Sequence, residues 1–238
     1  MFDYEPLSIP IAAAMPDGVA MLMRVPTPED RTAAQGLERL LAWEEQQLAE
    51  SMRGSNKIEF VCGRLALRTA CRRFGADVGP ILRDDRGAPV LPRDLTGSIA
   101  HRKGWVLAVV DWARNGTLGV DVESWPPSPS LAEHVLTVEE REQTAQLSDE
   151  ARERAVLVRF ALKEALFKAL DPYARRYFGF RDVVIEERGA SYRVALRSPE
   201  ARAYKILAFV QWWGEWVFAS TRVQLHVAAA HLEAVDAA

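Results

Sequence analysis

Only two cysteines occur in this chain of 238 residues, and their spacing excludes the usual cysteine-based sites. Cys62 and Cys71 are nine residues apart, which fits neither a Cys-x-x-Cys redox pair nor a zinc knuckle. We therefore expect two reduced thiols in the hydrophobic core and a cytoplasmic protein.

A surplus of basic residues is also missing. The chain has 30 Lys and Arg against 33 Asp and Glu, a formal net charge of −3 and an isoelectric point near 5.9. Nucleic-acid-binding domains usually carry a basic excess, so no nucleic-acid partner is expected. An anionic ligand would have to meet a local cluster of cations.

Long hydrophobic runs are absent. Apolar stretches such as Val106–Val110 are too short to span a bilayer, and Met1–Glu5 shows no basic or apolar signal region, so neither a membrane segment nor a secretory signal is expected. Hydrophobic residues make up 49% and charged residues 26%, the balance of a folded globular protein. This length suits one large domain or two of about 100 to 120 residues.

Hydrophobic spacing and turn residues predict an α+β protein. Helices are expected at 31–52, at 57–74 with a stop at Gly75, at 131–148, and at 151–170 with a stop at Asp171-Pro172. Strands are expected at 98–101, 104–110, 118–123, 183–185, 191–196, 205–210, 216–219 and 223–227. Turns are expected at 83–89 and at Arg102-Lys103.

The two halves of the chain resemble each other. Arg64–Ala70 aligns with Arg159–Ala165 at an offset of 159 − 64 = 95, with four identical positions, and Trp105–Ala108 resembles Trp216–Ala219 at an offset of 216 − 105 = 111. We infer a duplicated α+β unit, although chance similarity between common helix residues is the alternative. Thr69 aligns with Glu164, so only the second half carries a carboxylate there.

Two carboxylates occur on one predicted strand. Asp121 and Glu123 project to the same side of 118–123, because successive side chains of a strand alternate between its faces. Such a pair of oxygen ligands suits Mg²⁺. The alternative is a solvated face of an edge strand.

A third carboxylate lies in the helix predicted at 151–170. Glu164 and Lys168 share a helix face at i, i+4, and Lys163 precedes them among mostly apolar neighbours. Charges on a buried helix need partners or a metal. An ordinary surface salt bridge is the alternative.

Basic residues form another group in the first half. Arg64, Arg68 and Arg72 repeat every four residues along one helix, and Arg83, Arg86 and His101 lie near turns. Arginine forks match phosphate oxygens, although a solvated helix face would give the same stripe. His101 could equally be a core histidine.

Taken in order, these segments resemble the Sfp-like 4′-phosphopantetheinyl transferases, most closely their siderophore-type (EntD-like) branch. The resemblance covers about residues 57 to 184 and rests on the following motifs: Gly63-Arg64, the turn from Arg83 to Pro92, Gly97–His101, Gly119–Glu123, Phe160–Lys168 and Phe178–Asp182. It implies a pseudo-dimer of two α+β halves, 1–118 and 119–238, with coenzyme A and the active site in the cleft between them. The implied reaction moves 4′-phosphopantetheine from coenzyme A to a serine of an acyl or peptidyl carrier protein and releases 3′,5′-ADP.

The resemblance also implies roles for individual residues. Asp121 and Glu123 would bind Mg²⁺, with Glu164 as third ligand or as the general base. Lys168 would neutralise or protonate the leaving phosphate, and Lys163 would lie beside it. The groups expected to bind coenzyme A are Arg64, Arg83, Arg86, His101, the backbone of Ala100, Lys163 and Lys168. Glu123 or a metal-bound water remains open as the base, and a monomer is the default.

Three positions depart from the family pattern. Ala161 replaces a residue that is often a small hydroxyl or thiol, and Ala100 replaces a frequent Ser or Thr, and neither change touches a charged role. Ala88 stands where some members have a lysine, so the phosphate contact expected there must come from Arg83 or Arg86, and the assignment of individual arginines to phosphates is open. A non-catalytic binding module and a metal-dependent phosphohydrolase remain alternatives. The carrier is not identified, and Arg175-Arg176 is a candidate contact for its acidic surface, with a solvated basic turn as the alternative.

Overall fold

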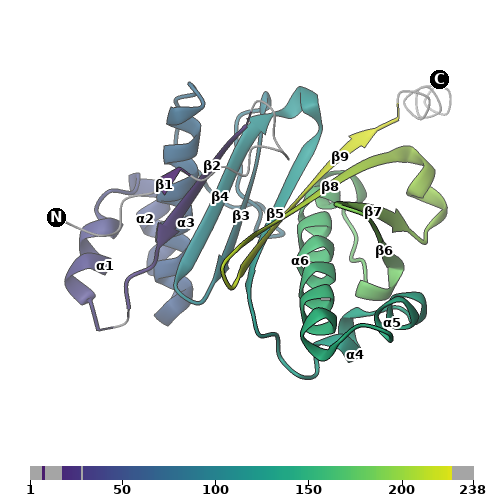
Figure 1. The fold of residues 1–238 in the computed structure, drawn as a ribbon. Coiled ribbons are helices and arrows are strands. Elements are labelled where there is room, and N and C mark those ends of the chain that lie inside the picture. The colour runs from purple at the N-terminus through teal and green to yellow at the C-terminus, as the bar shows by residue number, and fades with distance from the viewer. Residues whose placement is uncertain (1–6, 9–17, 28, 227–238) are drawn as a thin grey trace, which may run out of the picture. The chain divides into compact units, whose positions relative to one another are not determined.

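A computed structural model describes residues 7–8, 18–27 and 29–226 (Figure 1). The chain divides into two compact units. The first comprises Met1–Arg114 with Val120–Val122, and the second comprises Asn115–Gly119 with Glu123–Ala238. Each unit combines a long helix with antiparallel strands, so the predicted α+β class is confirmed.

The first unit is a four-stranded antiparallel sheet covered by one long helix (Figure 1). The strand order is β1 (Leu7–Ser8), β2 (Val19–Arg24), β4 (Trp105–Trp112) and β3 (Leu95–Arg102). Helix α3 (Gly54–Arg73) packs its apolar residues against β2 and β4 to form the core of the unit. The chain leaves the helix at Gly75, whose φ of +87° suits glycine, as predicted. Strands β1 and β2 were not predicted.

The helix predicted at 31–52 is wrong as a single element. The structure has two helices, α1 (Arg31–Glu38) and α2 (Trp43–Glu50), separated by a break. Ala42 is extended at the start of α2, where the Glu45 carboxylate accepts the Ala42 N–H at 2.8 Å. This cap satisfies a backbone donor that a continuous helix would have used internally.

Strands β3 and β4 form the predicted hairpin. Lys103 and Gly104, with φ of 42° and 79°, occupy the two turn positions, one residue later than expected. Two consecutive left-handed residues match the right-handed twist of the flanking strands. His101 pairs with Val106, so its position near the end of β3 is fixed by this register.

The second unit is built around helix α6 (Asp149–Ala174), which packs against strand β9 (Trp216–Leu225). The order in one sheet is β5 (Thr117–Ser124), β9 and β8 (Tyr204–Trp213), although Val120–Val122 of β5 belong to the first unit. In a second sheet, β6 (Val183–Arg188) pairs with β7 (Ser191–Leu196). The two segments predicted at 216–219 and 223–227 belong to one strand as far as Leu225, and residue 227 lies outside the described residues.

Short helices complete the two units. They are the 3₁₀-helix η2 (Ala113–Asn115), α4 (Leu131–Val135), α5 (Val138–Thr144), and the 3₁₀-helices η3 (Phe180–Asp182) and η4 (Pro199–Ala203). The helix predicted at 131–148 is therefore two helices. Thr137 separates them, because its extended backbone and its hydroxyl cap the start of α5.

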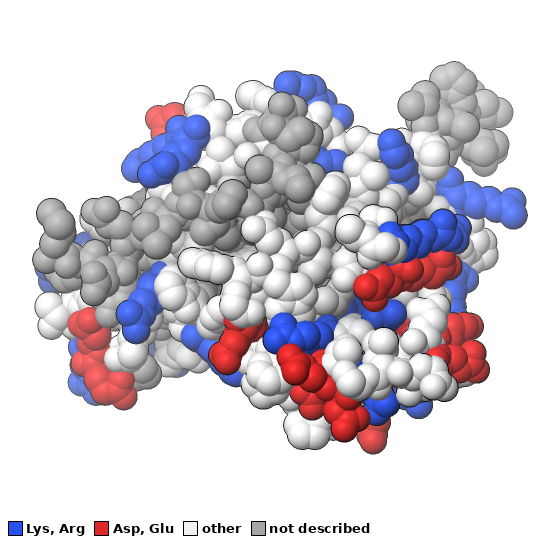
Figure 2. All heavy atoms as spheres, viewed as in Figure 1, with Lys and Arg blue, Asp and Glu red and all other residues white. Residues whose placement is uncertain are grey.

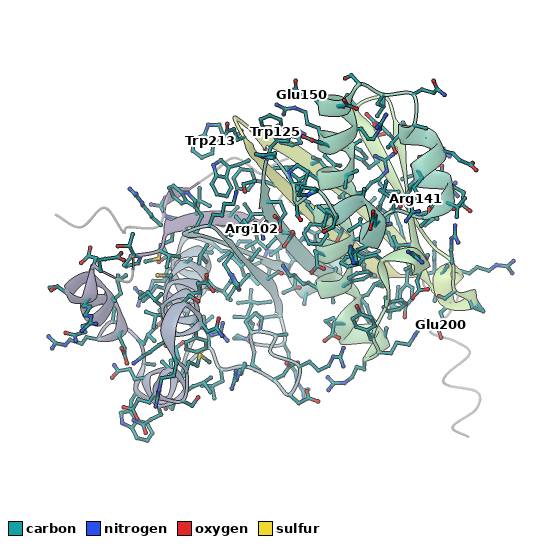
Figure 3. All side chains as sticks on the ribbon, turned by 90° about the horizontal axis from the view of Figure 1, so that it is seen from below. Arg102, Trp125, Arg141, Glu150, Glu200 and Trp213 are labelled. Atoms are coloured by element: carbon teal, nitrogen blue, oxygen red, sulfur yellow. The ribbon has the colours of Figure 1, made fainter. Side chains whose placement is uncertain are left out.

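Helix α6 is longer than predicted at both ends. Ser148 caps its start, and the helix passes Pro172 to end at Ala174, before Arg175 in the left-handed conformation. The proline stands in the last turn, where its missing N–H affects a single helical hydrogen bond. Near the start of α6, Arg154 lies over the Trp125 ring at 5.2 Å and pairs with Glu150, and Figure 3 labels Trp125 and Glu150.

No helix among the described residues is long and apolar enough to cross a membrane.

Acidic and basic side chains of described residues are interspersed on the face in Figure 2. Cys62 and Cys71 are free and fully buried, as predicted.

Candidate active site

Strand β5 lies directly against helix α6 because residue 119 has no side chain. A Cβ atom built on Gly119 would lie 2.0 Å from the backbone O of Ala165 and 2.7 Å from the backbone N of Ala169. Two residues earlier, the Thr117 hydroxyl donates to the Ala169 carbonyl at 2.6 Å. The backbones of β5 and α6 are thus in contact in this unit, which fixes the strand beside the turn of the helix that carries Glu164.

The two strand carboxylates are buried. Asp121 is 7% exposed and Glu123 is 6% exposed, and the residues between and before them are also buried. A solvated face of an edge strand is therefore wrong. Burying a carboxylate away from water costs free energy unless other groups compensate it, so the location of this pair needs a chemical reason.

Glu164 and Lys168 are half-buried on α6. They are four residues apart on the same helix face, with the half-buried Phe160 and Phe167 nearby on that side. Phe160 and Phe167 both pack against Phe180 of η3, with ring centroids 5.6 Å apart in each case. This face of α6 therefore combines an acid and a base with aromatic surroundings.

Lys163 lies in the interior of the unit, whereas the adjacent Glu164 is half-buried. Its side chain is fully buried, and Nζ donates to Glu140 Oε2 at 2.7 Å, to Val135 O at 2.9 Å and to Phe180 O at 2.9 Å. Burial lowers the pKa of Lys163, and the Glu140 carboxylate opposes that shift. All three donors of the ammonium are used within the protein, so this geometry does not support the expected contact of Lys163 with coenzyme A.

Arg64 of α3 is also buried, at 5% exposure. Its Nε donates to Ile81 O at 2.7 Å and its Nη2 to Leu82 O at 3.2 Å, so it holds the chain segment after α3. Burial lowers the pKa of Arg64 to about 10, the Glu45 carboxylate opposes that shift, and the charge of Arg83 adds to it. Part of this guanidinium is thus structural, and Arg83 is close enough for its charge to act on it.

The turn at 83–89 presents two exposed arginines. Arg83 pairs with Pro89 in an isolated bridge, and Asp84 Oδ1 accepts the N–H groups of Arg86 and Ala88, each at 2.9 Å. This carboxylate organises the turn, so Arg83 and Arg86 extend from an ordered loop. An exposed cation on a fixed loop is suited to an anionic ligand.

His101 is exposed near the end of β3, so the alternative of a core histidine is wrong. Its Nδ1 lies 3.3 Å from Glu59 Oε2 on α3, and 55% of its side chain is accessible. Ala100 beside it is buried. Of the arginine stripe, Arg68 donates to Val78 O and Gly79 O at 3.1 Å and Arg64 is buried, whereas Arg72 is exposed, so the stripe is not simply a solvated face.

Three carboxylates, Asp121, Glu123 and Glu164, are the ligands expected for Mg²⁺. Among the described residues, no three His, Cys, Asp or Glu side chains are gathered closely enough to hold a metal ion by themselves. The expected ligand set of Asp121, Glu123 and Glu164 is therefore not assembled as such a cluster in this structure. Two buried carboxylates on one strand still fit Mg²⁺, which is commonly bound through one or two carboxylates, with substrate phosphates and water as further ligands.

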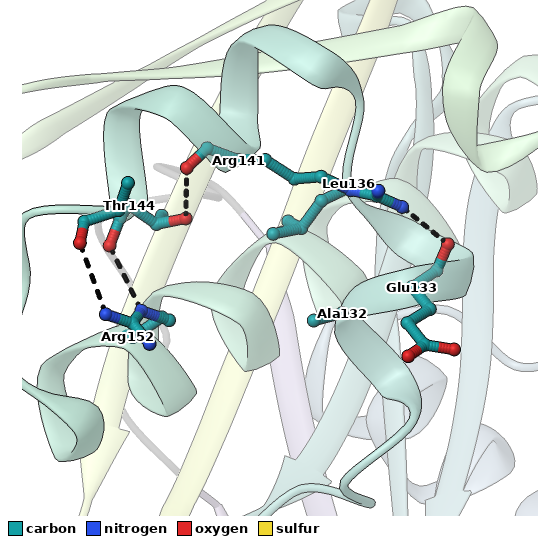
Figure 4. Close-up of a pocket in the computed structure, with 7 residues that line it drawn as sticks. Ala132, Glu133, Leu136, Arg141, Thr144 and Arg152 are labelled. Carbon is teal, nitrogen blue, oxygen red and sulfur yellow. Dashed lines mark hydrogen bonds between the residues drawn. The ribbon is translucent and has the colours of Figure 1, made fainter.

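One pocket of about 460 Å³ opens beside α4 and α5 (Figure 4). Its lining residues are Ala132, Glu133, Leu136, Arg141, Thr144, Ala145 and Arg152. Both arginines donate to backbone carbonyls, for example Arg141 to Glu133 O at 3.0 Å. None of the predicted site residues lines this pocket.

The proposed carrier contact at Arg175-Arg176 is partly engaged within the protein. Arg176 pairs with Glu200 at 2.8 Å and lies over the Phe178 ring at 4.1 Å. Both arginines are exposed.

Two family models match this chain. The 4′-phosphopantetheinyl transferase N-terminal domain matches residues 44–111, and the 4′-phosphopantetheinyl transferase superfamily matches residues 117–220. The 4′-phosphopantetheinyl transferase Npt of Nocardia iowensis is 30% identical over 179 residues, which cover 74% of this chain and 75% of Npt. This chain belongs to the 4′-phosphopantetheinyl transferase superfamily. The resemblance drawn from the motifs is thereby confirmed.

Other relatives match shorter parts. Enterobactin synthase component D of Salmonella austin is 33% identical, over 48% of this chain and 47% of the relative. Among solved structures, the holo-[acyl-carrier-protein] synthase of Thermotoga maritima covers 46% of this chain and 63% of its own, with a TM-score of 0.40 and 22% identity.

Sequence reasoning missed the buried acids Glu45 and Glu140, each fully buried. A signal for the second was present, because Thr137 and Glu140 have the spacing of a capping box. The sequence indicates Gly119 only as part of a motif, because a close approach of two backbones does not show in hydrophobic spacing.

Proposed function

We propose that this protein transfers the 4′-phosphopantetheine group from coenzyme A to a serine hydroxyl of an acyl or peptidyl carrier protein. The reaction depends on Mg²⁺, releases 3′,5′-ADP and converts the apo carrier to the holo carrier. The enzyme acts in the cytoplasm as a monomer, and its candidate carriers are those of siderophore, peptide, polyketide and fatty-acid biosynthesis. Membership of the superfamily supports the class of reaction.

The observation that carries the proposal is the burial of Asp121 and Glu123 on a strand in backbone contact with α6. Two nearly inaccessible carboxylates destabilise a fold unless a cation or a dense set of donors compensates their charge. A divalent cation that also binds substrate phosphates would do so. When bound, Mg²⁺ supplies positive charge to the phosphate oxygens of coenzyme A.

The residues of this chain then divide the remaining work. Asp121 and Glu123 hold the cation, and Glu164 serves as its third ligand or as the acceptor of the serine proton, a task suited to a carboxylate within hydrogen-bond reach. Lys168 neutralises the leaving phosphate. Phosphoryl transfer depends mainly on such positioning and charge neutralisation.

The first half, residues 1–118, contributes the coenzyme A contacts. Exposed Arg83 and Arg86 bind phosphate oxygens, and His101 with the Ala100 backbone adds a further contact. Arg64 supports this set from beneath, because it holds the carbonyls of Ile81 and Leu82 that lead into the turn. The second half, residues 119–238, contributes the acids and Lys168.

The test is an intact-mass assay. Purified protein, Mg²⁺ and coenzyme A are incubated with a panel of apo carriers from siderophore, peptide, polyketide and fatty-acid pathways, and the product must be heavier by one phosphopantetheine. Omitting Mg²⁺, or adding excess chelator, should abolish the gain. No mass change with any carrier would count against the proposal.

Variants that remove one charge test whether Asp121 and Glu164 take part in the transfer reaction. Asp121→Asn and Glu164→Gln should each lower kcat by about 100-fold or more, because they remove charge that acts in the transition state. Glu153→Gln is the matched control for the second, since Glu153 is an exposed acid on the same helix. Tight calorimetric binding of coenzyme A without any transfer would favour a non-catalytic binding module, and carrier-independent release of ADP would favour a phosphohydrolase.

A further inference from the structure

Each unit contains a buried carboxylate that joins three parts of that unit. In the first, Glu45 of α2 accepts the Ala42 N–H at 2.8 Å, the Ile81 N–H at 2.8 Å and Arg68 Nη2 at 2.5 Å. The carboxylate thus joins the start of a short helix, a cation of the long helix α3 and the chain that follows α3. We call this group, Glu45 with Arg68, the first clamp.

The second unit repeats this arrangement. Glu140 of α5 accepts the Thr137 N–H at 2.8 Å, the Ile185 N–H at 2.8 Å and Lys163 Nζ at 2.7 Å. Again a carboxylate at the third position of a short helix joins the start of that helix, a cation of the long helix α6 and the following chain. We call Glu140 with Lys163 the second clamp.

The two clamps have the same offset as the repeated helix sequence. The carboxylates differ by 140 − 45 = 95, the cations by 163 − 68 = 95, and the capped residues by 137 − 42 = 95. The surrounding sequences, Leu41-Ala42-Trp43-Glu44-Glu45 and Leu136-Thr137-Val138-Glu139-Glu140, agree at the three positions Leu, Glu and Glu. The third contacts, from the N–H groups of Ile81 and Ile185, differ by 185 − 81 = 104, so the offset of 95 does not extend to the chain that follows each long helix. Chance similarity of common helix residues does not reproduce a capped residue, a carboxylate and a cation in the same contacts at one offset.

The residue that follows each cation differs. Thr69 follows Arg68 and donates its hydroxyl to Leu65 O at 2.8 Å, an ordinary bond within the helix. Glu164 follows Lys163. The cation of the first clamp is therefore followed by Thr69, which has no proposed role in the reaction. The cation of the second clamp is followed by Glu164, the proposed third carboxylate.

We propose that the second clamp is a positioning device that fixes the rotation of α6, and with it Glu164 and Lys168, for the chemical step. This inference rests on the proposed function. Lys163 Nζ is held by acceptors from three places, namely Glu140 in α5, Val135 at the end of α4 and Phe180 in η3. Three acceptors from different elements on a fully buried ammonium restrain the turn of α6 around Lys163 against rotation.

The first clamp has a different task. Arg68 donates to Val78 O and Gly79 O, and Glu45 holds the Ile81 N–H, so this clamp fixes the segment that leads into the turn of Arg83 and Arg86. Its loss should disturb the binding of coenzyme A. Loss of the second clamp should disturb the chemical step.

The experiment compares two matched variants, Lys163→Met and Arg68→Met, at a temperature where circular dichroism shows both folded. Lys163→Met should lower kcat about tenfold to a hundredfold, as expected for a small displacement of catalytic groups, while the KM for coenzyme A changes less than about threefold. Arg68→Met should raise that KM and leave kcat within about twofold. A merely structural role would give the two variants the same pattern.

Two further variants keep the test decisive if Lys163→Met does not fold. Glu140→Gln and Glu45→Gln keep the shape of each carboxylate, and they should show the same opposite split between kcat and KM. Lys163→Arg should restore much of kcat, because it retains a cation with several donors.

The outcomes separate the two proposals. A wild-type protein that transfers nothing to any carrier overturns the proposed function and this inference with it. An active wild-type protein whose Lys163→Met and Glu140→Gln variants retain kcat, or lose only coenzyme A affinity, overturns the positioning role alone.

Discussion

Gly119 provides the most direct test of how β5 is held against α6. In Gly119→Ala, the new Cβ would lie 2.0 Å from Ala165 O, whereas an ordinary contact begins at 3.4 Å, so the two backbones must separate by about 3.4 − 2.0 = 1.4 Å. The obstructing atoms belong to the backbone of a buried helix and cannot rotate away. Overpacking of this kind costs about 3 kcal/mol when the backbone has to move.

The expected loss can be measured as a melting temperature. For a chain of this size, 1 kcal/mol corresponds to about 2 to 4 °C, so Gly119→Ala should unfold about 6 to 12 °C below the wild type in calorimetry. The displaced strand carries Asp121 and Glu123, so transfer activity should also fall in the protein that remains folded.

Gly36→Ala is the matched control. A Cβ at Gly36 meets nothing within 4 Å, and the residue lies exposed in α1. Removing glycine from a helix stabilises it by about 0.5 to 1 kcal/mol, so this variant should melt slightly higher than the wild type. Equal melting temperatures for Gly119→Ala and the wild type would refute the close approach.

Two other predictions concern the thiols and the arginine turn. Burial raises the pKa of Cys62 to about 12 and that of Cys71 to about 11, so neither should react with a thiol reagent at pH 8 until the protein unfolds. The unfolded thiols ionise near pH 9.0, so the unfolded state binds fewer protons above that pH, and stability should fall by about 1 kcal/mol per thiol by pH 10. The free energy of unfolding can be measured by urea titration at several pH values. If it depends on pH in a Cys62→Ala, Cys71→Ala variant as it does in the wild type, this prediction is contradicted. Asp84→Ala removes the acceptor of two turn N–H groups and should raise the KM for coenzyme A several-fold at constant kcat, and an unchanged KM would separate the turn from coenzyme A binding.

Much of the fold could be predicted from hydrophobic spacing, because the long helices and the hairpin strands have strong periodic patterns. The breaks could not. The 31–52 and 131–148 segments each contain two helices, since Glu45 and Glu140 cap a second helix start with a buried carboxylate. A residue that is polar in sequence but fully buried in the fold does not show in a pattern built on polarity.

The continuation of α6 past Pro172 has a similar cause. A proline in a helix interior removes a hydrogen bond, and the sequence therefore predicts a stop. In the last turn the loss is small, and Tyr173 beyond it packs against Tyr204, with ring centroids 6.0 Å apart. Tertiary contact outweighs the local preference here.

In the candidate site, too, the sequence pattern predicts which residues share a face but does not predict their burial. Asp121 and Glu123 could be paired from strand alternation alone, but their burial comes from tertiary packing, which alternation does not report. Exposure at His101 is likewise a property of the hairpin's end. The sequence predicts which groups share a face, and the fold determines which faces meet solvent.

Lys163 and Lys168 show how one helix separates two lysines that a motif groups together. Five residues correspond to a rotation of about 140° around the helix axis, whereas Glu164 and Lys168 are only about 40° apart. Lys163 therefore lies on the stripe of Val156, Leu166 and Leu170, all buried, at spacings of seven, three and seven residues. A lysine in an apolar stripe needs a buried acceptor, and Glu140 supplies it. Helical rotation thus places Lys163 in the interior, whereas Glu164 and Lys168, to which we assign the proposed chemistry, lie half-buried on another face of α6.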